Sequence, residues 1–221
     1  MTPARPVLVL VGPPGAGKTT IGRILARRLG VGFTDVDALV VERAGKSISD
    51  VFLQDGEPAF RELEREVVAE ALDGVDGVLA LGGGSVLAAE TRERLRGHVV
   101  VHLSVGRADG LRRTGLSTAR PLLAGVNPRA TFKALLDARA PLYREVATVE
   151  VATDRRTTGQ VVRAVLAALG HPTGADGADG ADDADGADPA ADPDPGDDRG
   201  AGSAAAPLPD PTFGPRPGGG Q

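Results

Sequence analysis

The sequence contains no cysteine among its 221 residues. This absence excludes disulfide bonds, metal sites built on thiolates and catalysis by a cysteine nucleophile. It also fits a reducing compartment, and we expect the protein to be cytoplasmic.

Long apolar runs and aromatic residues are also scarce. The apolar run at Val7–Val11 leads into glycine and proline, and it is too short for a signal-peptide core or a membrane span. The chain has one tyrosine, five phenylalanines and no tryptophan, and it lacks a basic stripe for the phosphates of a nucleic acid. We therefore expect no membrane and no nucleic acid as partners, and we expect a monomer.

The distribution of charge divides the chain in two. Residues 1–170 hold 23 Lys and Arg against 19 Asp and Glu, a net charge of +4. Residues 171–221 hold 11 acidic residues against Arg199 and Arg216, a net charge of −9, and are mostly Gly, Ala, Asp and Pro. Such a segment has too little apolar surface to offset the entropy lost on ordering. We predict a folded domain at 1–170 and a disordered acidic tail at 171–221, which is either a solubilising extension or an interaction arm.

Short apolar runs alternate with segments of helical periodicity, which predicts βα units and a parallel sheet. The predicted strands are Val7–Val11, Gly32–Asp35, Val78–Leu81, Val99–Leu103 and Thr148–Ala152. The predicted helices are Thr19–Leu29, Glu57–Leu72, one from Pro128 towards Tyr143 with Asn127 as its cap, and one from Thr157 or Thr158 to near Gly170. A doubly wound sheet binds ligands at the carboxyl ends of its strands.

A glycine-rich loop follows the first predicted strand. The segment Gly12-Pro13-Pro14-Gly15-Ala16-Gly17-Lys18-Thr19 matches the phosphate-loop motif and leads into a helix. Its backbone N–H groups and the positive end of the helix dipole would surround phosphate oxygens. Lys18 would reach the β- and γ-phosphates, and the Thr19 hydroxyl would bind Mg²⁺. The motif indicates a nucleoside triphosphate site, which kinases, GTPases and motor ATPases all share.

Two aspartates end the second predicted strand. Asp35 and Asp37 are spaced i and i+2, which on a strand points both side chains the same way. One could hold a magnesium-bound water and the other could orient a substrate hydroxyl. A solvated strand end or a helix cap explains the pair equally well.

Glycines and arginines add candidate binding groups. Gly82, Gly83 and Gly84 follow the third predicted strand and would let a ligand approach the backbone closely, although a flexible turn explains them as well. Arg61 is expected on the exposed side of its helix, and Arg139 lies in a later helix. Each arginine taken alone fits a solvated surface position as well as a ligand-binding one.

A segment poor in core residues, 114–119, suits a mobile lid. Arg112, Arg113 and Arg120 flank it. Basic residues on such a lid would close over ATP and neutralise charge on the transferred phosphoryl group.

Together these features resemble the shikimate kinase family across nearly all of residues 5–170. Any one motif could occur by chance, but their order and spacing are specific. The motifs are the phosphate loop, Asp35-x-Asp37, Gly56-Glu57-x-x-Phe60-Arg61-x-x-Glu64, Gly82-Gly83-Gly84, Arg120-Pro121-Leu122-Leu123 and Arg139-x-Pro141-x-Tyr143.

The resemblance implies an α/β fold of the P-loop NTPase type. Its parallel five-stranded sheet would have the order 2-3-1-4-5, with flanking helices and a mobile lid. The resemblance also implies ATP and Mg²⁺ as cofactors. The reaction would transfer the γ-phosphate of ATP to the 3-hydroxyl of shikimate, giving 3-phosphoshikimate and ADP in the biosynthesis of chorismate and aromatic amino acids.

The resemblance further implies roles for individual residues. The catalytic group would be Lys18, Asp37 against the accepting hydroxyl, and Arg120 on the lid. Magnesium would be held by Thr19 and, through water, by Asp35.

Two binding sets complete these implied roles. Shikimate would lie against Asp37, Arg61, Gly82, Gly83, Gly84 and Arg139, with the two arginines on its carboxylate and Gly83 at its ring hydroxyls. A pair of planar arginine forks would also select an acid over a neutral sugar. The nucleotide would lie against Gly15, Ala16, Gly17, Lys18, Thr19, Thr20, Arg113, Arg120 and Arg156.

The chain departs from the family pattern after its last predicted strand. The segment Ala152-Thr153-Asp154-Arg155-Arg156-Thr157-Thr158 lacks the aspartate and the proline usual there, so Arg156 is the one adenine-side contact carried over. Two other functions remain open: another small-molecule kinase, for gluconate or a nucleoside monophosphate, and a nucleotide-dependent switch with the tail as its interaction arm. The sequence has no Asn/Thr-Lys-x-Asp motif for guanine, which argues against a GTPase switch.

Overall fold

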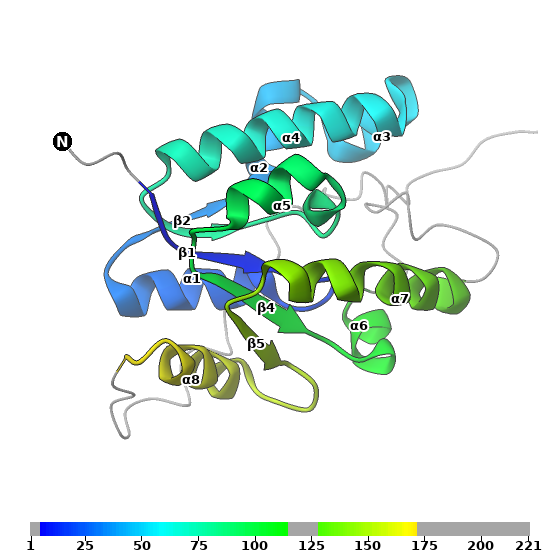
Figure 1. Ribbon diagram of the computed structural model, residues 1–221. Coiled ribbons are helices and arrows are strands. Elements are labelled where there is room, and N and C mark those ends of the chain that lie inside the picture. Colours follow the sequence, from blue (N-terminus) through cyan, green and yellow to red (C-terminus); the bar gives the residue numbers. More distant parts are fainter. Residues whose placement is uncertain (1–4, 115–127, 172–221) are drawn as a thin grey trace, which may run out of the picture. The chain divides into compact units, whose positions relative to one another are not determined.

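Five parallel strands form a central sheet (Figure 1). The strands are β1 (Pro6–Val11), β2 (Gly32–Asp35), β3 (Gly77–Ala80), β4 (Val100–Ser104) and β5 (Val149–Ala152). Their spatial order is β2-β3-β1-β4-β5, so the predicted sheet and its order are confirmed.

The computed structural model describes residues 5–114 and 128–171. Most of the predicted lid, including Arg120, and the tail after His171 lie outside the described residues.

The helices connect these strands. They are α1 (Lys18–Leu29), α2 (Val36–Ala44), α3 (Ile48–Gln54), α4 (Gly56–Gly74), α5 (Ala89–Leu95), α6 (Arg107–Thr114), α7 (Pro128–Val146) and α8 (Thr158–Ala168), with the short 3-10 helix η1 (Ser85–Leu87). The sequence predicted α1, α4, α7 and α8 to within a few residues. It did not predict α2, α3, α5 or α6, which have only seven to nine residues each. Such short helices show little apolar periodicity.

The central strand β1 is buried on both faces because its alternate residues face two different cores. Leu8 and Leu10 pack with residues of α1 and α8, whereas Val9 and Val11 pack with residues of α2, α4 and α7. All four are at most 1% exposed. Burial of one such aliphatic side chain contributes about 1.5–3 kcal/mol. This burial fixes the strand that leads into the phosphate loop.

We expected Asp35 and Asp37 to lie on one continuous strand, but they do not. β2 ends at Asp35, whose side chain caps α2 by accepting the backbone N–H of Asp37 at 3.1 Å. The prediction from strand alternation was therefore wrong, because the capping bond turns the chain into a helix at the first aspartate. Both residues nevertheless remain at the carboxyl end of the sheet.

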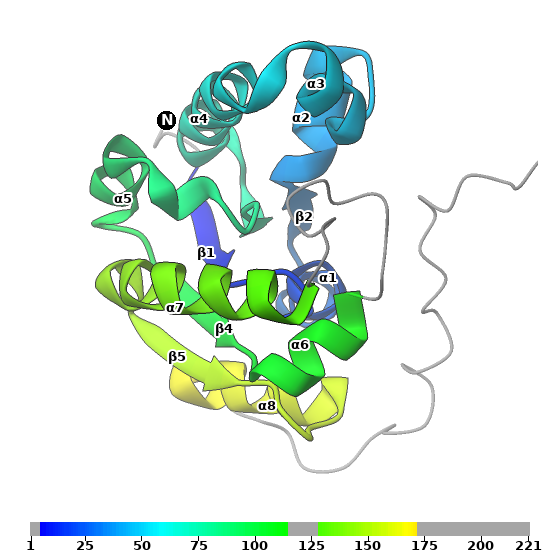
Figure 2. The same cartoon turned by 90° about the vertical axis from the view of Figure 1, so that its right-hand side faces the viewer.

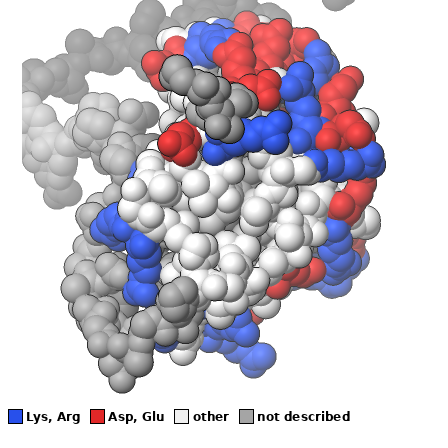
Figure 3. Space-filling view, turned by 60° about the vertical axis from the view of Figure 1, so that its left-hand side comes forward, with Lys and Arg blue, Asp and Glu red and all other residues white. Residues whose placement is uncertain are grey.

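The two ends of the sheet differ. Figure 2 looks onto the carboxyl ends of the strands, where α7 crosses in front and α2, α3 and α4 stand to one side. The amino-terminal side of the strands comes forward in Figure 3, and its visible face is mostly uncharged, with charged residues gathered around its margin. The phosphate loop, the Asp35 and Asp37 segment and the triple glycine follow the carboxyl ends of β1, β2 and β3, which agrees with the rule for ligand sites in such sheets.

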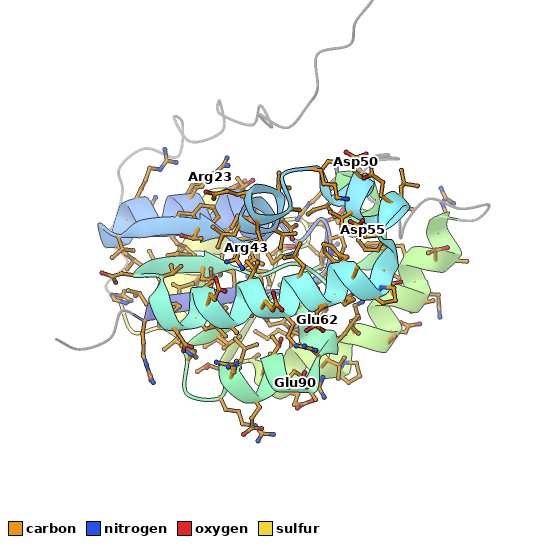
Figure 4. The ribbon with its side chains drawn as sticks, turned by 90° about the horizontal axis from the view of Figure 1, so that it is seen from above. Arg23, Arg43, Asp50, Asp55, Glu62 and Glu90 are labelled. Carbon is orange, nitrogen blue, oxygen red and sulfur yellow. The ribbon has the colours of Figure 1, made fainter. Side chains whose placement is uncertain are left out.

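Helices α2, α3 and α4 pack together beside the carboxyl end. Arg43 of α2 points towards α4, where it pairs with Glu70 (Figure 4). The rings of Phe52 and Phe60 lie 4.5 Å apart between α3 and α4. The exposed ion pair adds little stability, so apolar packing of this kind sets the position of α4. That position matters because α4 carries Arg61.

Candidate functional site

The phosphate loop requires glycine at three of its positions. Gly12, Gly15 and Gly17 have φ angles of +148°, +78° and +87°. A Cβ atom at Gly12 would also overlap the carbonyl of Leu103 on β4. Gly17 caps α1 without a side-chain hydrogen bond, so no side chain occupies the first N–H groups of that helix. The loop therefore leaves these N–H groups able to bind an anion.

The Lys18 ammonium lies over this loop. Its Nζ donates to the carbonyl of Gly12 at 2.9 Å and to that of Pro13 at 3.3 Å. The side chain is half-buried. These bonds hold a positive charge beside the first N–H groups of α1, where the motif predicts the phosphates to lie.

Oxygen atoms of Thr19 and Asp35 meet beside the loop. The Thr19 hydroxyl donates to Oδ2 of Asp35 at 2.7 Å, while Oδ1 of Asp35 caps α2. These oxygens fit Mg²⁺, which prefers oxygen ligands and usually takes one or two from the protein and the rest from phosphates and water. Among the described residues, no group of three or more His, Cys, Asp or Glu could hold a metal.

The three glycines after β3 have close neighbours at every position. A Cβ atom at Gly82 would lie 2.5 Å from Oε1 of Glu64 and 2.8 Å from Oδ1 of Asp37. At Gly83 it would lie 3.1 Å from Pro14 of the phosphate loop, and at Gly84 it would overlap the Arg61 guanidinium. The turn thus brings Asp37, Arg61 and the phosphate loop together, and a larger residue at any of the three positions would force one of these neighbours to shift.

Arg61 is held by two carboxylates on its own helix. Its Nη1 donates to Oε2 of Glu64 at 2.7 Å and its Nη2 to Oε1 of Glu57 at 3.1 Å. The Arg61 side chain is 22% exposed, so the expectation of an exposed helix face was wrong. A solvated surface arginine does not explain this geometry, because the two ion pairs fix the guanidinium against Gly84.

Arg139 reaches the same turn from α7. Its Nη1 donates to the carbonyl of Gly83 at 3.1 Å, and the Tyr143 hydroxyl donates to that carbonyl at 2.6 Å. Two residues four positions apart on a helix lie on the same face. The structure therefore places Arg61 and Arg139, which are 78 positions apart in the sequence, on either side of one three-residue turn.

The predicted nucleotide residues Arg113 and Arg156 differ in their contacts. Arg113 of α6 donates through Nη1 to Oγ1 of Thr153 at 3.0 Å and through Nη2 to the Thr153 carbonyl at 2.8 Å. Asp154 accepts the backbone N–H of Gly106 at 2.7 Å. Arg156 is exposed and makes no hydrogen bond or ion pair within the described part of the chain. The structure thus anchors Arg113 beside this loop and leaves Arg156 unplaced.

Three residues of the site were not among the predicted site residues: Glu64, Ser85 and Tyr143. Glu64 is only 3% exposed and accepts from the Ser85 hydroxyl at 2.8 Å as well as from Arg61. The sequence did contain a signal for it. Glu64 occupies a position in the apolar stripe of α4, which otherwise consists of Phe60, Val67, Val68, Ala71 and Leu72. A carboxylate in such a stripe needs buried partners.

Glu64→Gln tests this buried network. The amide keeps the size of the side chain but removes the charge that pairs with Arg61, and we expect a loss of about 1–3 kcal/mol in unfolding free energy. For a chain of this size that corresponds to a fall of about 2–12 °C in Tm. Glu62→Gln is the matched control, because Glu62 pairs with Arg65 on the exposed side of the same helix. Equal Tm values for the two variants would contradict the assigned role of Glu64.

Comparison with known proteins decides the family. The family model for shikimate kinase matches residues 14–170. A shikimate kinase of Saccharopolyspora erythraea is 69% identical over 149 residues, which are 67% of this chain and 85% of that protein. The chain belongs to the shikimate kinase family. It is therefore a kinase that uses ATP, as the sequence predicted.

Other members of the shikimate kinase family agree with this assignment. The protein of Thermobifida fusca is 59% identical over 154 residues, covering 70% of this chain and 89% of that protein. A solved shikimate kinase of Acinetobacter baumannii, in complex with shikimate, has a TM-score of 0.72 and 38% identity, covering 75% of this chain and 93% of that one. Within the described ranges, no helix has the length and apolar character needed to cross a membrane.

Proposed function

We propose that this chain phosphorylates the 3-hydroxyl of shikimate with ATP, giving 3-phosphoshikimate and ADP, in the pathway to chorismate and the aromatic amino acids. Membership of the shikimate kinase family supports this function. The observation that carries it for these residues is the convergence of Asp37, Arg61 and Arg139 on the triple-glycine turn beside the phosphate loop.

On the donor side, the loop N–H groups from Gly15 to Thr20 bind the phosphates, and Lys18 places its charge at the β- and γ-phosphates. Thr19 and, through water, Asp35 hold Mg²⁺, for which their paired oxygens are suited. When bound, magnesium neutralises charge that develops on the phosphate oxygens. Lys18 would exchange its present bonds to loop carbonyls for phosphate oxygens.

On the acceptor side, Arg61 and Arg139 bind the carboxylate of shikimate, and Gly82, Gly83 and Gly84 lie along its ring. Asp37 orients the 3-hydroxyl and accepts its proton as the new O–P bond forms and the bond from the γ-phosphorus to the bridging oxygen of ADP breaks. The arginine forks match a planar carboxylate with two donors each. Glu57 and Glu64 support this role because they fix the plane of the Arg61 guanidinium.

On the nucleotide side, Arg113 contributes from its anchored position beside Thr153. Arg156 belongs to the same loop and is assigned to the nucleotide through the family pattern. Arg120 is the lid arginine, and its role as a catalytic residue stays a prediction because it lies outside the described residues. Asp154 and Thr153 stabilise a loop that lacks the usual aspartate and proline.

A coupled ADP-release assay with shikimate, quinate, gluconate and nucleoside monophosphates tests the function. We expect release only when shikimate is present, because the two arginines require a carboxylate and Asp37 requires a hydroxyl at one position. Quinate also carries both groups, so release with quinate as the best acceptor would mean that the acceptor is misassigned. Release with gluconate or a nucleotide as the best acceptor would favour another small-molecule kinase. Release without any acceptor would favour an ATPase or switch.

We also propose that the catalytic domain is residues 1–170 and that the acidic residues from 171 onward do not contribute to it. The His171 backbone N–H donates to the Leu166 carbonyl at 2.9 Å, so the test deletes residues 172–221 and keeps this bond. We expect Tm and turnover to stay nearly unchanged, since the composition of the tail cannot support a core. A large fall in Tm would show that the tail stabilises the domain.

The remaining proposals concern the cellular location and the oligomeric state of the enzyme. The lack of cysteine supports a cytoplasmic location, and we propose that the chain acts as a monomer. Sedimentation of the purified protein at several concentrations measures this directly, and a dimer at micromolar concentration would contradict it.

A further inference from the structure

The carbonyl of Gly83 accepts two hydrogen bonds from one helix. Tyr143 donates its hydroxyl at 2.6 Å and Arg139 donates Nη1 at 3.1 Å. A backbone carbonyl has two lone pairs, so these two donors saturate it. The middle residue of the triple-glycine turn is therefore fastened to α7 at a single atom.

Tyr143 is fixed more firmly than Arg139. Tyr143 is 1% exposed, and its ring stacks on the ring of His102 of β4, with centroids 5.1 Å apart and an angle of 25° between the planes. Burial raises the pKa of the Tyr143 hydroxyl to about 12. The hydroxyl thus stays a neutral donor at every pH at which the enzyme would be assayed.

The charged groups around this pair come from several elements. Nδ1 of His102 lies 3.7 Å from Glu150 of β5, and burial lowers the pKa of His102. Arg139 and Arg61 face the Tyr143 hydroxyl from α7 and α4, together with Glu64. A neutral His102 gives the tyrosine ring an uncharged stacking surface, so the position of the ring is set by packing.

We propose that Tyr143 is a positioning residue for the acceptor. By donating to the Gly83 carbonyl, its hydroxyl holds the triple-glycine turn in place. Because it occupies part of that carbonyl, it also limits how strongly the Arg139 guanidinium is attracted to the same oxygen. This inference rests on the proposed function, in which Gly83 and Arg139 bind shikimate. This inference goes beyond the proposed function because that function assigns Tyr143 to neither substrate.

The close contacts of the turn explain why one hydroxyl has this effect. Gly83 lies against Pro14 of the phosphate loop, and Gly84 lies against the Arg61 guanidinium. A shift of the turn therefore changes its distance from the donor loop and from the first arginine together. Without the tyrosine hydroxyl, Arg139 becomes the sole side-chain donor among the described residues to the Gly83 carbonyl, and its guanidinium is less available to the carboxylate.

Tyr143→Phe tests the proposal because it keeps the ring and its contact with His102 and removes only the hydroxyl. We expect KM for shikimate to rise about 2- to 13-fold, the range for loss of one ordinary hydrogen bond, while KM for ATP changes by less than about twofold. Thr148→Val is the matched control. Its hydroxyl bonds to backbone groups of Val100 and His98 at the amino end of the sheet, so its loss should leave both KM values unchanged.

A double variant distinguishes positioning from a purely structural role. If Tyr143 acts through Gly83 and Arg139, the rise in KM for Tyr143→Phe and Arg139→Lys together is smaller than the product of the two single effects. A lower Tm with both KM values unchanged in Tyr143→Phe would overturn the proposal, and so would multiplicative effects in the double variant. If the wild-type chain released no ADP with shikimate, the proposed function itself would fail, and this outcome is separate from the response of Tyr143→Phe.

Discussion

Lys18→Ala is expected to lower kcat by about 100-fold or more while the fold survives. The ammonium lies over the phosphate loop on the carbonyls of Gly12 and Pro13, where negative charge develops during phosphoryl transfer. Removal of one fixed electrostatic partner of a transition state typically costs about 10²–10³ in kcat. The lysine acts mainly in the transition state, so its loss falls on kcat more than on KM for ATP.

The measurement is a steady-state assay at saturating ATP and shikimate, accompanied by thermal unfolding. Lys46→Ala serves as the control, because Lys46 pairs with Asp55 2.6 Å away between α2 and the start of α4 and has no role at the loop. We expect full activity from it. A kcat of Lys18→Ala within about threefold of wild type would contradict the assigned role. Such a change corresponds to less than about 0.7 kcal/mol in activation free energy, because a tenfold change corresponds to about 1.4 kcal/mol.

Arg61→Lys and Arg139→Lys are each expected to raise KM for shikimate strongly while KM for ATP changes little. Lysine keeps the positive charge but loses the planar pair of donors that matches a carboxylate. A charge-assisted contact contributes about 1.5–3 kcal/mol, so kcat/KM for shikimate should fall about 10- to 150-fold. Kinetics with each substrate varied at saturating concentration of the other separates the two KM values.

Two control variants bracket this result. Arg65→Lys lies one turn further along α4, and Arg65 pairs with Glu62 on the exposed side, so the expected effect is small. Arg113→Lys should act on KM for ATP, since Arg113 is anchored at Thr153. Unchanged KM for shikimate in both Arg61→Lys and Arg139→Lys would mean that the acid-binding site is misplaced, and other small-molecule kinases would again be candidates.

The structure adds a second expected effect of Arg61→Lys. In the sequence, Arg61 is one arginine among several on a charged helix. Its ion pairs with Glu57 and Glu64 give the substitution a second consequence, because Arg61→Lys removes a fitted partner from the buried Glu64. We therefore expect this variant to lose more thermal stability than Arg139→Lys, whose guanidinium bonds a carbonyl that Tyr143 also holds.

Features that depend on neighbouring residues in the chain could be predicted from the sequence. The phosphate loop was recognised because each glycine, the lysine and the threonine act within eight consecutive positions between a strand and a helix. The five strands and the longer helices followed from apolar periodicity, and the sheet order came from the resemblance to a family. At Asp35 the sequence left two alternatives open, because the same aspartate can end a strand or cap a helix, and the bond that it accepts from the Asp37 backbone N–H decides for the cap.

Features that depend on contacts between distant segments were decided by the tertiary structure alone. Periodicity marks Glu64 as an odd residue in an apolar stripe, but it does not reveal that Ser85 and Arg61 satisfy it. Nor does it reveal that Tyr143 and Arg139 share the carbonyl of Gly83, some 60 positions earlier. Local patterns specify which residues become strand, helix or loop, whereas the partners of a buried polar group are set only when packing of the sheet and helices brings separate segments within hydrogen-bond distance.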